Sequence, residues 1–318
     1  MNFKQKRILV TGGAGFIGSH LVDRLIKEDP YNIVAMDTLC LGKKENLEDA
    51  IKHNIVDLEI ADAANYGLIR EMIESYNIDT IFNLACDPLP KSLVDPEKCF
   101  KNNVDITLNV CELLRLGLYK SLVHFSSSEV YGTCIVSPMS EEHPLNPTTP
   151  YAASKAACDH LVMTYFKTFG LDCRIIRPFN NYGPRQNEKE YAGIIPVTIA
   201  RILNGEKPII FGTGQQIRDF TYVVDTADST IEICKTEESL GKVFNIAAGY
   251  TVTMNGLVKN ICALMDYKRT IKYKASRPGD VKELVGDMSL AKRVANIKPF
   301  HKFQEGLKNT IQYQRDRN

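Results

Sequence analysis

The residues near the beginning of the 318-residue chain constrain its fold most strongly. A short run rich in β-branched residues, 7–11, is followed by the glycine-rich stretch 12–18 and then by an apolar stripe at helical spacing. The stripe consists of Ile17, Leu21, Val22, Leu25 and Ile26. Glycine suits the stretch between two such segments because a residue without a Cβ lets the backbone turn tightly. This order predicts a strand, a turn and a helix.

The glycine turn also has the chemistry of a dinucleotide site. Backbone without side chains can approach a pyrophosphate closely, and the start of a helix offers N–H groups and a partial positive charge to phosphates. The residues expected to contact a cofactor here are Gly12, Gly15, Phe16, Ile17 and Gly18. The next apolar run, 32–36, ends in Asp37, whose carboxylate would accept hydrogen bonds from an adenosine ribose and repel a 2′-phosphate. NAD is therefore predicted rather than NADP. The alternative interpretation is that Asp37 only begins a turn.

Strand-like and helix-like segments continue to alternate after Asp37. Strands are expected at 55–61, 80–84, 122–125 and 173–177, and helices at 66–76, 99–116 and 151–169. Such alternation predicts right-handed βαβ units and an α/β fold with a doubly wound parallel sheet. Asp62, Ala63 and Ala85 follow strands directly, so we expect them at the carboxyl edge of the sheet, where an open α/β sheet binds its ligand.

The second part of the chain is less regular. Helices are expected at 192–204, 255–265 and 304–313, and a strand at 207–211. We predict an NAD-binding domain at 1–178 and a smaller α/β substrate-binding portion at 179–318. The boundary is soft, because no linker or repeat separates the two parts, and segments are expected to cross between them.

Composition excludes several classes of function. A hydrophobic fraction of 44% and a net charge of +1 are those of a globular protein that gathers neither nucleic acid nor an anionic membrane. The nine cysteines are scattered, which predicts free thiols in a reducing cytoplasm, and with the six histidines they form no metal-ligand spacing. Neither a signal peptide nor a membrane span is expected.

A proton-transfer group is predicted around Tyr151 and Lys155. The two residues are four apart in a helix-like segment, so their side chains project from one face. A nearby ammonium favours the phenolate and lowers the pKa of a tyrosine, which makes it a better base. Ser127, at the end of a strand, would share the substrate hydroxyl with Tyr151. A tyrosine in the core beside a lysine on the surface is the competing interpretation of the spacing alone.

Several motifs together resemble the nucleotide-sugar branch of the extended short-chain dehydrogenases/reductases. They are the stretches 11–18, 126–132, 151–155, 177–185, 218–223 and 277–280, together with Asp37. The resemblance covers nearly the whole chain in order. It implies a Rossmann domain that holds NAD and a C-terminal portion that closes over a nucleotide diphosphate-sugar.

The same resemblance implies roles for individual residues. Tyr151 is the base, Lys155 binds the ribose and lowers the pKa of Tyr151, and Ser127 is the partner at the sugar O4. Asn180 contacts the diphosphate, and Arg218 and Arg277 clamp it, which suits the planar donor fork of a guanidinium. Surface ion pairs are the alternative for both arginines.

The resemblance also implies a homodimer. Its relatives pair two helices of each subunit in a four-helix bundle, and here these are the segments 99–116 and 151–169. Burial of the same apolar faces within one chain is the competing interpretation.

The net reaction depends on the fate of the 4-keto sugar that oxidation at C4 produces. Ser128 and Glu129 are the discriminating positions, because 4,6-dehydratases of dTDP- and UDP-sugars usually carry Asp-Glu there. Ser-Glu resembles UDP-glucuronate decarboxylases and GDP-mannose 4,6-dehydratases instead. We predict 4-epimerisation. Release of the 4-keto sugar, with a GDP-sugar as one candidate substrate, is the first alternative, and decarboxylation or dehydration comes behind it. A Rossmann sensor without catalysis is a further alternative.

Overall fold

A seven-stranded parallel sheet forms the larger lobe of the protein. The structure is a computed structural model that describes residues 1–188, 192–276, 279–298 and 300–317. The strand order is β3-β2-β1-β4-β5-β6-β11, and every neighbouring pair is parallel. The strands are β1 (Arg7–Thr11), β2 (Asn32–Asp37), β3 (Val56–Ile60), β4 (Thr80–Asn83), β5 (Ser121–Phe125), β6 (Asp172–Pro178) and β11 (Val243–Ile246). The predicted doubly wound α/β fold is confirmed.

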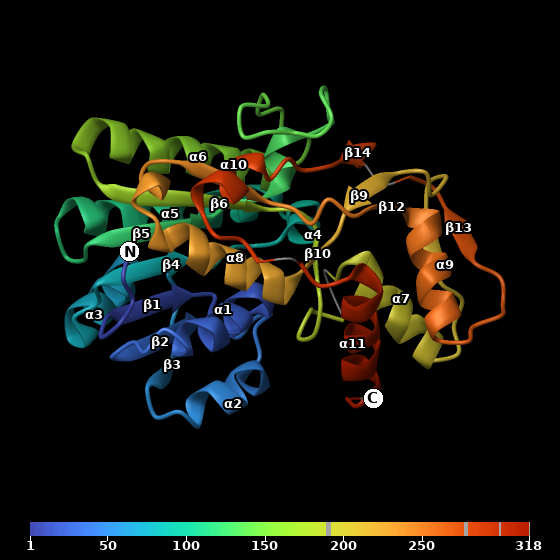
Figure 1. The fold of residues 1–318 in the computed structure, drawn as a ribbon, viewed down its shortest axis with the longest axis horizontal. Coiled ribbons are helices and arrows are strands. Elements are labelled where there is room, and N and C mark those ends of the chain that lie inside the picture. The colour runs from blue at the N-terminus through green and yellow to red at the C-terminus, as the bar shows by residue number, and fades with distance from the viewer. Residues whose placement is uncertain (189–191, 277–278, 299, 318) are drawn as a thin grey trace.

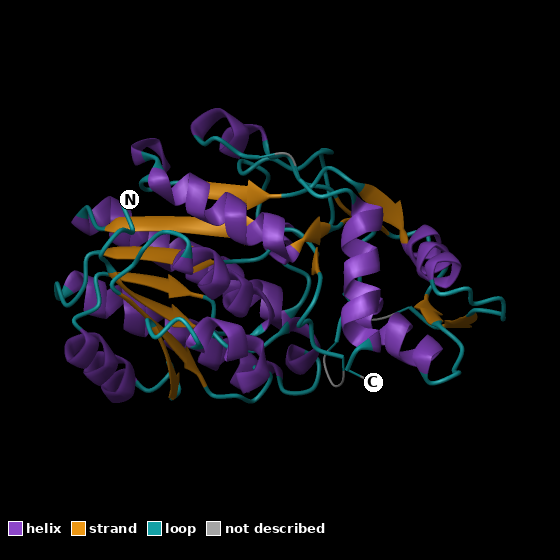
Figure 2. Cartoon of the chain, turned by 60° about the horizontal axis from the view of Figure 1, so that its bottom comes forward, coloured by secondary structure: helices purple, strands orange, loops and turns teal. Residues whose placement is uncertain are grey.

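Helices cover both faces of this sheet (Figures 1 and 2). One face carries α1 (Phe16–Ile26), α8 (Val223–Lys235) and α10 (Ser289–Val294), with η1 (Lys44–Leu47) and α2 (Glu48–Ile51) beside them. The other face carries α3 (Tyr66–Tyr76), α5 (Pro96–Arg115) and α6 (Pro150–Phe169). Short turns of helix are α4 (Leu89–Ser92), η2 (Ser128–Tyr131) and η3 (Glu237–Ser239). The strand order reverses between β1 and β4, which places the predicted ligand edge next to the glycine turn.

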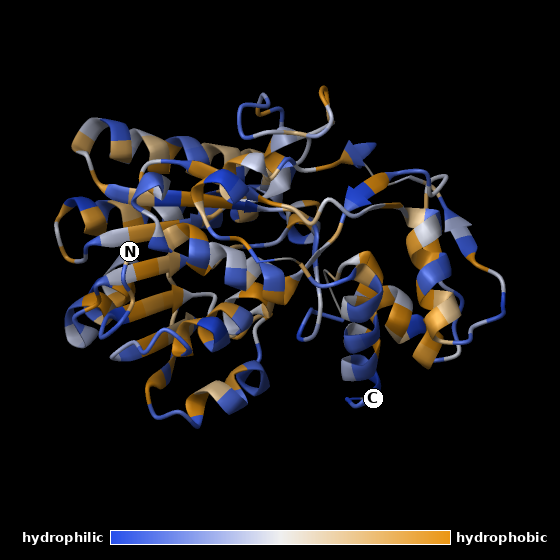
Figure 3. Ribbon diagram, viewed as in Figure 1, coloured by the Kyte–Doolittle hydropathy of each residue, from blue (hydrophilic) through white to orange (hydrophobic). Residues whose placement is uncertain are grey.

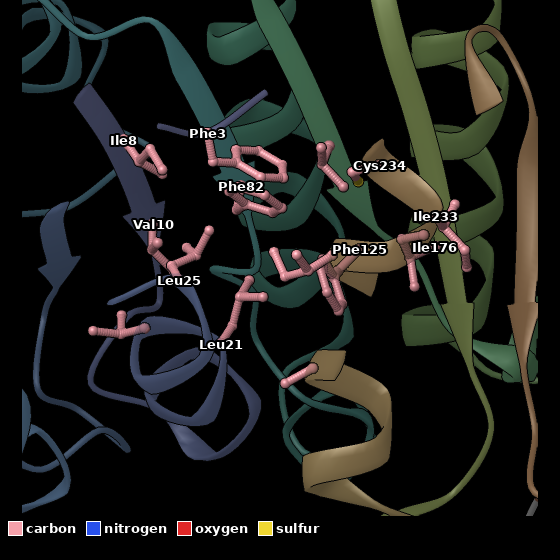
Figure 4. Close-up of a cluster of buried hydrophobic side chains, with 14 of the residues drawn as sticks. Phe3, Ile8, Val10, Leu21, Leu25, Phe82, Phe125, Ile176, Ile233 and Cys234 are labelled. Carbon is pink, nitrogen blue, oxygen red and sulfur yellow. The ribbon is translucent and has the colours of Figure 1, made fainter. Parts of the chain in front are cut away.

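The sheet separates two apolar cores. Figure 4 shows Leu25 of α1 beside Val10 of the sheet, Phe82 beside Phe3, and Ile233 of α8 beside Ile176. The core on the opposite face is built by α3, α5 and α6. Colouring by hydropathy shows apolar residues along the strands and on the inner faces of these helices (Figure 3). Burial of both faces explains why the inner strands β1 and β2 are mostly apolar, whereas the edge strand β3 carries Asp57 and Glu59.

The smaller lobe has its own core. Its helices are α7 (Ile194–Leu203), α9 (Met254–Leu264) and α11 (Phe303–Arg315). Its short strands are β7 (Asn181–Tyr182), β8 (Ile209–Phe211), β9 (Ile217–Asp219), β10 (Thr221–Tyr222), β12 (Thr251–Thr253), β13 (Lys272–Lys274) and β14 (Glu283–Leu284). Tyr182, Phe220 and Phe303 pack with ring centroids 5.2–6.3 Å apart at the centre of this lobe.

Chain segments pass between the two lobes. After residue 178 the chain enters the smaller lobe, but α8 and β11 return to the large sheet before α9 leaves it again. We keep the division into 1–178 and 179–318 as a proposal for the two binding functions, with α8, β11 and α10 belonging structurally to the larger lobe. In the described part of the chain, no helix is long and apolar enough to cross a bilayer.

Candidate active site

The glycine turn between β1 and α1 has no room for side chains. Gly12 has a φ of +68°, and a Cβ there would lie 3.0 Å from the backbone nitrogen of Ala85. A Cβ on Gly18 would lie 2.1 Å from the carbonyl oxygen of Gly12. Gly15 occupies the N-cap position of α1 and has no side chain to cap the helix. The backbone N–H groups of Phe16 and Ile17, in the first turn, therefore lack a capping side chain. This turn fits the pyrophosphate of a dinucleotide.

Asp37 lies at the carboxyl end of β2 beside this turn. The side chain is buried, and its two oxygens accept hydrogen bonds from the backbone N–H groups of Ala14 (3.1 Å) and Leu39 (2.8 Å). Burial raises the pKa of Asp37, and the backbone donors oppose that rise. The position and the acceptor atoms fit the ribose role that the sequence predicts for this residue.

Strands β4 and β3 deliver the other predicted cofactor residues to the same edge of the sheet. Thr11 holds the start of the β4 loop, because its hydroxyl accepts the N–H groups of Leu84 (3.1 Å) and Ala85 (3.2 Å). Ala63 is buried after β3, and its carbonyl accepts a hydrogen bond from the Asn109 amide at 3.0 Å. Asp62 is exposed, and its carboxylate accepts a hydrogen bond from the backbone N–H of Ala64 at 2.9 Å.

Helix α6 positions the predicted proton-transfer pair. Thr149 caps the helix by accepting the N–H of Ala152 at 3.2 Å, and Pro150 fills the first helical position. The Lys155 ammonium is buried and donates to the carbonyl oxygen of Phe125 at 2.9 Å. The structure brings the hydroxyl groups of Tyr151 and Ser127 into hydrogen-bonding contact, and their shared role toward a substrate hydroxyl stays a prediction.

The environment of Tyr151 opposes its ionisation. Burial raises the pKa of Tyr151 well above its usual value, and the nearby Cys86 and Glu129 add to the rise, whereas the Ser127 hydroxyl lowers it. The sequence predicts that Lys155 lowers the pKa of Tyr151. This lowering has to overcome the effect of burial, and it stays a prediction. A positive charge close to the phenol, brought by the cofactor, acts in the same direction.

The helical turn η2 carries the two residues that were expected to discriminate between reactions. Ser127 caps η2 by accepting the N–H of Glu129 at 3.2 Å. Ser128 is buried, with 2% of its surface exposed. The Glu129 carboxyl group is close enough to Arg218 and Asp280 of the smaller lobe for their charges to interact. Burial raises the pKa of Glu129, and the Arg218 guanidinium partly offsets that rise. The Glu129 carboxyl group can therefore form a hydrogen bond with a sugar hydroxyl, as donor when protonated or as acceptor when ionised.

The predicted substrate residues approach from the smaller lobe. Arg218 of β9 is mostly buried and donates to Asp280 at 2.7 Å, and the Gln216 amide donates to the other Asp280 oxygen at 2.9 Å. Asn180 donates to the carbonyl of Asp219 at 3.2 Å. Arg277 lies outside the described residues. The guanidinium of Arg218 is thus held by the Asp280 carboxylate, and a bound diphosphate would compete with that carboxylate for it.

Sequence reasoning missed Asn103, which supports the site from α5. Its amide donates to Ser154 (2.9 Å) and to the carbonyl of Asp87 (3.1 Å), and its oxygen accepts the N–H of Asp87 (2.7 Å). Asn103 therefore joins the β4 loop to the turn of α6 between Tyr151 and Lys155. The signal in the sequence was a buried amide on the apolar face of a helix, which has to find partners.

These features are those of a dinucleotide-binding α/β fold with a tyrosine, a lysine and a serine gathered at the carboxyl edge of its sheet. Comparison with known proteins gives the family. Residues 9–310 match the family described as GDP-mannose 4,6 dehydratase. The chain belongs to this family, in the nucleotide-sugar branch of the extended short-chain dehydrogenases/reductases.

Similar proteins span the reactions of that branch. The chain is 34% identical to UDP-glucose 4-epimerase of Mycolicibacterium smegmatis, covering 98% of this chain and 99% of that protein. It is 34% identical to UDP-glucuronic acid decarboxylase 3 of Arabidopsis thaliana, covering 95% and 86%. The solved UDP-N-acetylglucosamine 4-epimerase from Methanobrevibacter ruminantium M1 has a TM-score of 0.90 and 35% identity, covering 99% and 100%.

The family fixes the cofactor and the enzymatic character. Solved structures of similar proteins contain bound NAD, so the prediction of NAD is confirmed. The similar proteins are NAD-dependent epimerases, dehydratases and decarboxylases, which confirms that the chain is an enzyme and removes the sensor alternative.

Proposed function

We propose that the protein is a 4-epimerase of a neutral nucleotide diphosphate-sugar, most simply a UDP-hexose or UDP-N-acetylhexosamine. The observation that carries this proposal is the carboxyl group of Glu129 next to Tyr151 and Arg218. Burial already disfavours a charge on Glu129, and a hexuronate would bring a second carboxylate into the same space at a further desolvation cost. The two similar epimerases that act on UDP-glucose and UDP-N-acetylglucosamine by name support the UDP assignment.

The residues of the site divide the work of one oxidation. Ser127 orients the sugar O4 hydroxyl toward Tyr151, and Tyr151 accepts its proton. Lys155, fixed by the Phe125 carbonyl, keeps a positive charge one helical turn from the phenol. NAD supplies the acceptor for the C4 hydride when it is bound. In the reverse step, the same Tyr151 returns the proton to O4 after the ring has presented its other face.

The smaller lobe supplies the grip on the diphosphate. Arg218 on β9 and Asn180, directly before β7, are each held by hydrogen bonds before a substrate binds. In this proposal Arg277 completes the clamp. If the substrate is held mainly through its diphosphate, the sugar can rotate within the site. Epimerisation requires this rotation.

One observation favours a second candidate, 4,6-dehydration. Elimination of water needs a base for the proton at C5 and an acid for the leaving hydroxyl at C6, and the raised pKa of Glu129 suits the acid. The adjacent Ser128 is buried and carries no carboxyl group. The pair of carboxyl groups found in the usual Asp-Glu arrangement is therefore incomplete here, which ranks dehydration second.

Mass spectrometry of the products tests the proposal. The purified protein is incubated with UDP-, GDP- and dTDP-sugars, including hexuronates and N-acetylhexosamines. We expect a new chromatographic peak of unchanged mass from a UDP-sugar. Loss of water, of carbon dioxide or of two hydrogens would identify a dehydratase, a decarboxylase or a 4-dehydrogenase, respectively, and each would contradict epimerisation.

We also propose a homodimer in a reducing compartment such as the cytoplasm. Phe100 and Leu108 expose more than a third of their surface on α5, eight residues apart on one face of the helix. Exposed apolar residues at this spacing suit a helix-to-helix interface. All nine cysteines are free thiols, which supports a compartment where disulfides do not form.

A further inference from the structure

A third ionisable residue continues the face of α6 that carries Tyr151 and Lys155. Asp159 lies four residues after Lys155, so the three side chains follow one another at successive turns. Asp159 is almost fully buried, and one of its oxygens accepts a hydrogen bond from the Arg177 Nε at 2.8 Å. The Ser126 hydroxyl lies near this carboxylate, although Ser126 Oγ and the second Asp159 oxygen are both buried without a hydrogen-bond partner among the described residues. Ser126 immediately precedes Ser127, the proposed partner of Tyr151.

Arg177 extends the contact to the opposite end of the same segment. It lies on β6 with 4% of its surface exposed, and its Nη1 donates to the Tyr131 hydroxyl at 2.8 Å. The guanidinium carbon lies 4.9 Å from the centre of the Tyr131 ring. The Tyr131 hydroxyl in turn donates to Asn245 of β11 at 2.7 Å. Tyr131 is the last residue of η2, so this chain of contacts ends where the turn carrying Glu129 ends.

Residues 126–131 form a segment that we call the catalytic loop. Asp159 lies beside its first residue, Ser126, and Arg177 donates a hydrogen bond to its last residue, Tyr131. Arg177 also donates a hydrogen bond to Asp159, so the two side chains are joined. We propose that Asp159 and Arg177 are positioning residues that hold both ends of the catalytic loop against α6, so that Ser127 and Glu129 face Tyr151. Neither residue reaches the reacting atoms, and both act through the loop and through Lys155.

The pair also contributes to the electrostatics around Tyr151. Asp159 lies close enough to Lys155 for the two charges to interact. The groups that face Tyr151 or Lys155 from other elements are Cys86, Cys99, Glu129 and His124. If the negative charge of Asp159 is removed, Lys155 and Arg177 remain as uncompensated positive charges. Positive charge favours the phenolate, so Tyr151 is expected to ionise at lower pH.

The test compares Asp159→Asn with Asp159→Glu in the NAD-loaded protein. Tyrosine labelled with ¹³C at Cζ reports ionisation by NMR, and the signal of Tyr151 is assigned by its loss in Tyr151→Phe. We expect the titration of Tyr151 to move to lower pH in Asp159→Asn and to stay near the wild-type position in Asp159→Glu. A buried, misfitting Glu should nevertheless slow cofactor reduction about tenfold, because the catalytic loop shifts.

Tyr131→Phe tests the positioning role without removing a charge. It deletes the hydroxyl between Arg177 and Asn245, and we expect kcat to fall about tenfold with little change in KM. The control is Asp172→Asn, which removes the partner of Arg174 at the other end of β6. That ion pair is remote from the catalytic loop, so Asp172→Asn should leave both the titration and kcat unchanged.

The outcomes separate this proposal from the proposed function, on which its kinetic measurement rests. If no nucleotide-sugar reduces the cofactor in the wild-type protein, the proposed function fails, and the titration still decides the role of Asp159. An identical titration in Asp159→Asn and wild type, or one absent from both, overturns the electrostatic role. Unchanged kcat in Tyr131→Phe overturns the positioning role. If Asp159→Asn does not fold, the kcat values of Asp159→Glu and Tyr131→Phe still decide the positioning role.

Discussion

The phenol of Tyr151 is a buried group whose hydroxyl meets Ser127 and whose neighbours oppose its charge. Removing that hydroxyl removes the proton acceptor while leaving the glycine turn and Asp37 untouched. We expect Tyr151→Phe to slow reduction of bound NAD by a nucleotide-sugar by about 10²–10⁴-fold. Absorbance of the reduced cofactor in a stopped-flow instrument measures the rate.

Tyr165→Phe is the matched control, because it removes a tyrosine hydroxyl from the same helix. The Tyr165 hydroxyl bonds to Glu112 of α5, away from the catalytic loop. Its NAD reduction should match that of the wild-type protein. Retention of NAD by Tyr151→Phe is checked by the absorbance of the purified protein. Wild-type turnover in Tyr151→Phe would exclude this residue from the mechanism.

The glycine turn makes a separate prediction about binding. Gly18→Ala places a Cβ 2.1 Å from the Gly12 oxygen, so the turn has to open. We expect NAD affinity to fall at least tenfold, measured by isothermal titration of the cofactor-free protein. Gly170→Ala is the control: this C-cap glycine has a φ of +67° and open space around it. It should cost about 1 kcal/mol of stability and leave NAD affinity unchanged. Equal losses of affinity in both variants would contradict the steric argument.

Residues close together in sequence were predictable, and residues joined by the fold were not. Tyr151 and Lys155 share a helix face, so their spacing alone placed them side by side. Asp159 belongs to the same face, yet its partner Arg177 lies on a strand whose position depends on the whole sheet. The contact between Arg218 and Asp280 likewise joins segments that are far apart in sequence, so no local pattern indicated it.

At the scale of elements, the bounds of a helix were predicted accurately where its apolar periodicity was strong and residues typical of helix ends were present. The predicted helix 66–76 matches α3, and α6 ends before Gly170 as expected for a left-handed C-cap. Helix α8 went unpredicted because its buried face includes Thr226, Ser229 and Thr230, which blur the apolar stripe. The place of β11 at the edge of the sheet was also unpredictable, since strand order is not encoded locally.

Strand β9 carries a carboxylate whose protonation affects stability. Asp219 is fully buried and accepts the N–H groups of Ala248 and Gly249, each at 3.0 Å. Burial raises the pKa of Asp219 to about 6 from an ordinary value of 3.8. The folded state therefore binds more protons than the unfolded state between these values, and stability falls as pH rises through them. The difference corresponds to about 3 kcal/mol.

Asp219→Asn should remove this pH dependence. Urea unfolding at about pH 4 and about pH 7 measures it as the change in the free energy of unfolding for each protein. We expect the variant to be less stable overall, because an amide offers one acceptor oxygen to two N–H donors. Asp266→Asn, at an exposed carboxylate, serves as the control and should follow the wild type. Equal pH dependence in all three proteins would show that Asp219 keeps its ordinary pKa.

At the scale of the whole molecule, the proposed dimer rests on the exposed face of α5. Introducing charge at Phe100 and Leu108 together, as Phe100→Asp and Leu108→Asp, should convert the dimer to a monomer. Burying two carboxylates in an apolar interface is strongly unfavourable. Analytical ultracentrifugation measures the mass. Leu240→Asp changes an equally exposed leucine on another surface and should leave the dimer intact. A wild-type protein that sediments as a monomer would refute the proposal.

The return of the chain to the large sheet has a consequence for its synthesis. Strand β11 pairs with β6 along Val243–Ile246, so β6 gains its second neighbour from a segment made long after it. A nascent chain that has emerged only as far as residue 178 exposes the N–H and C=O groups of β6 as an open edge. Its sheet also lacks α8, which contributes Ile231 and Ile233 to the core beside α1. The NAD-binding lobe therefore cannot finish folding at the ribosome until much of the smaller lobe has also been translated.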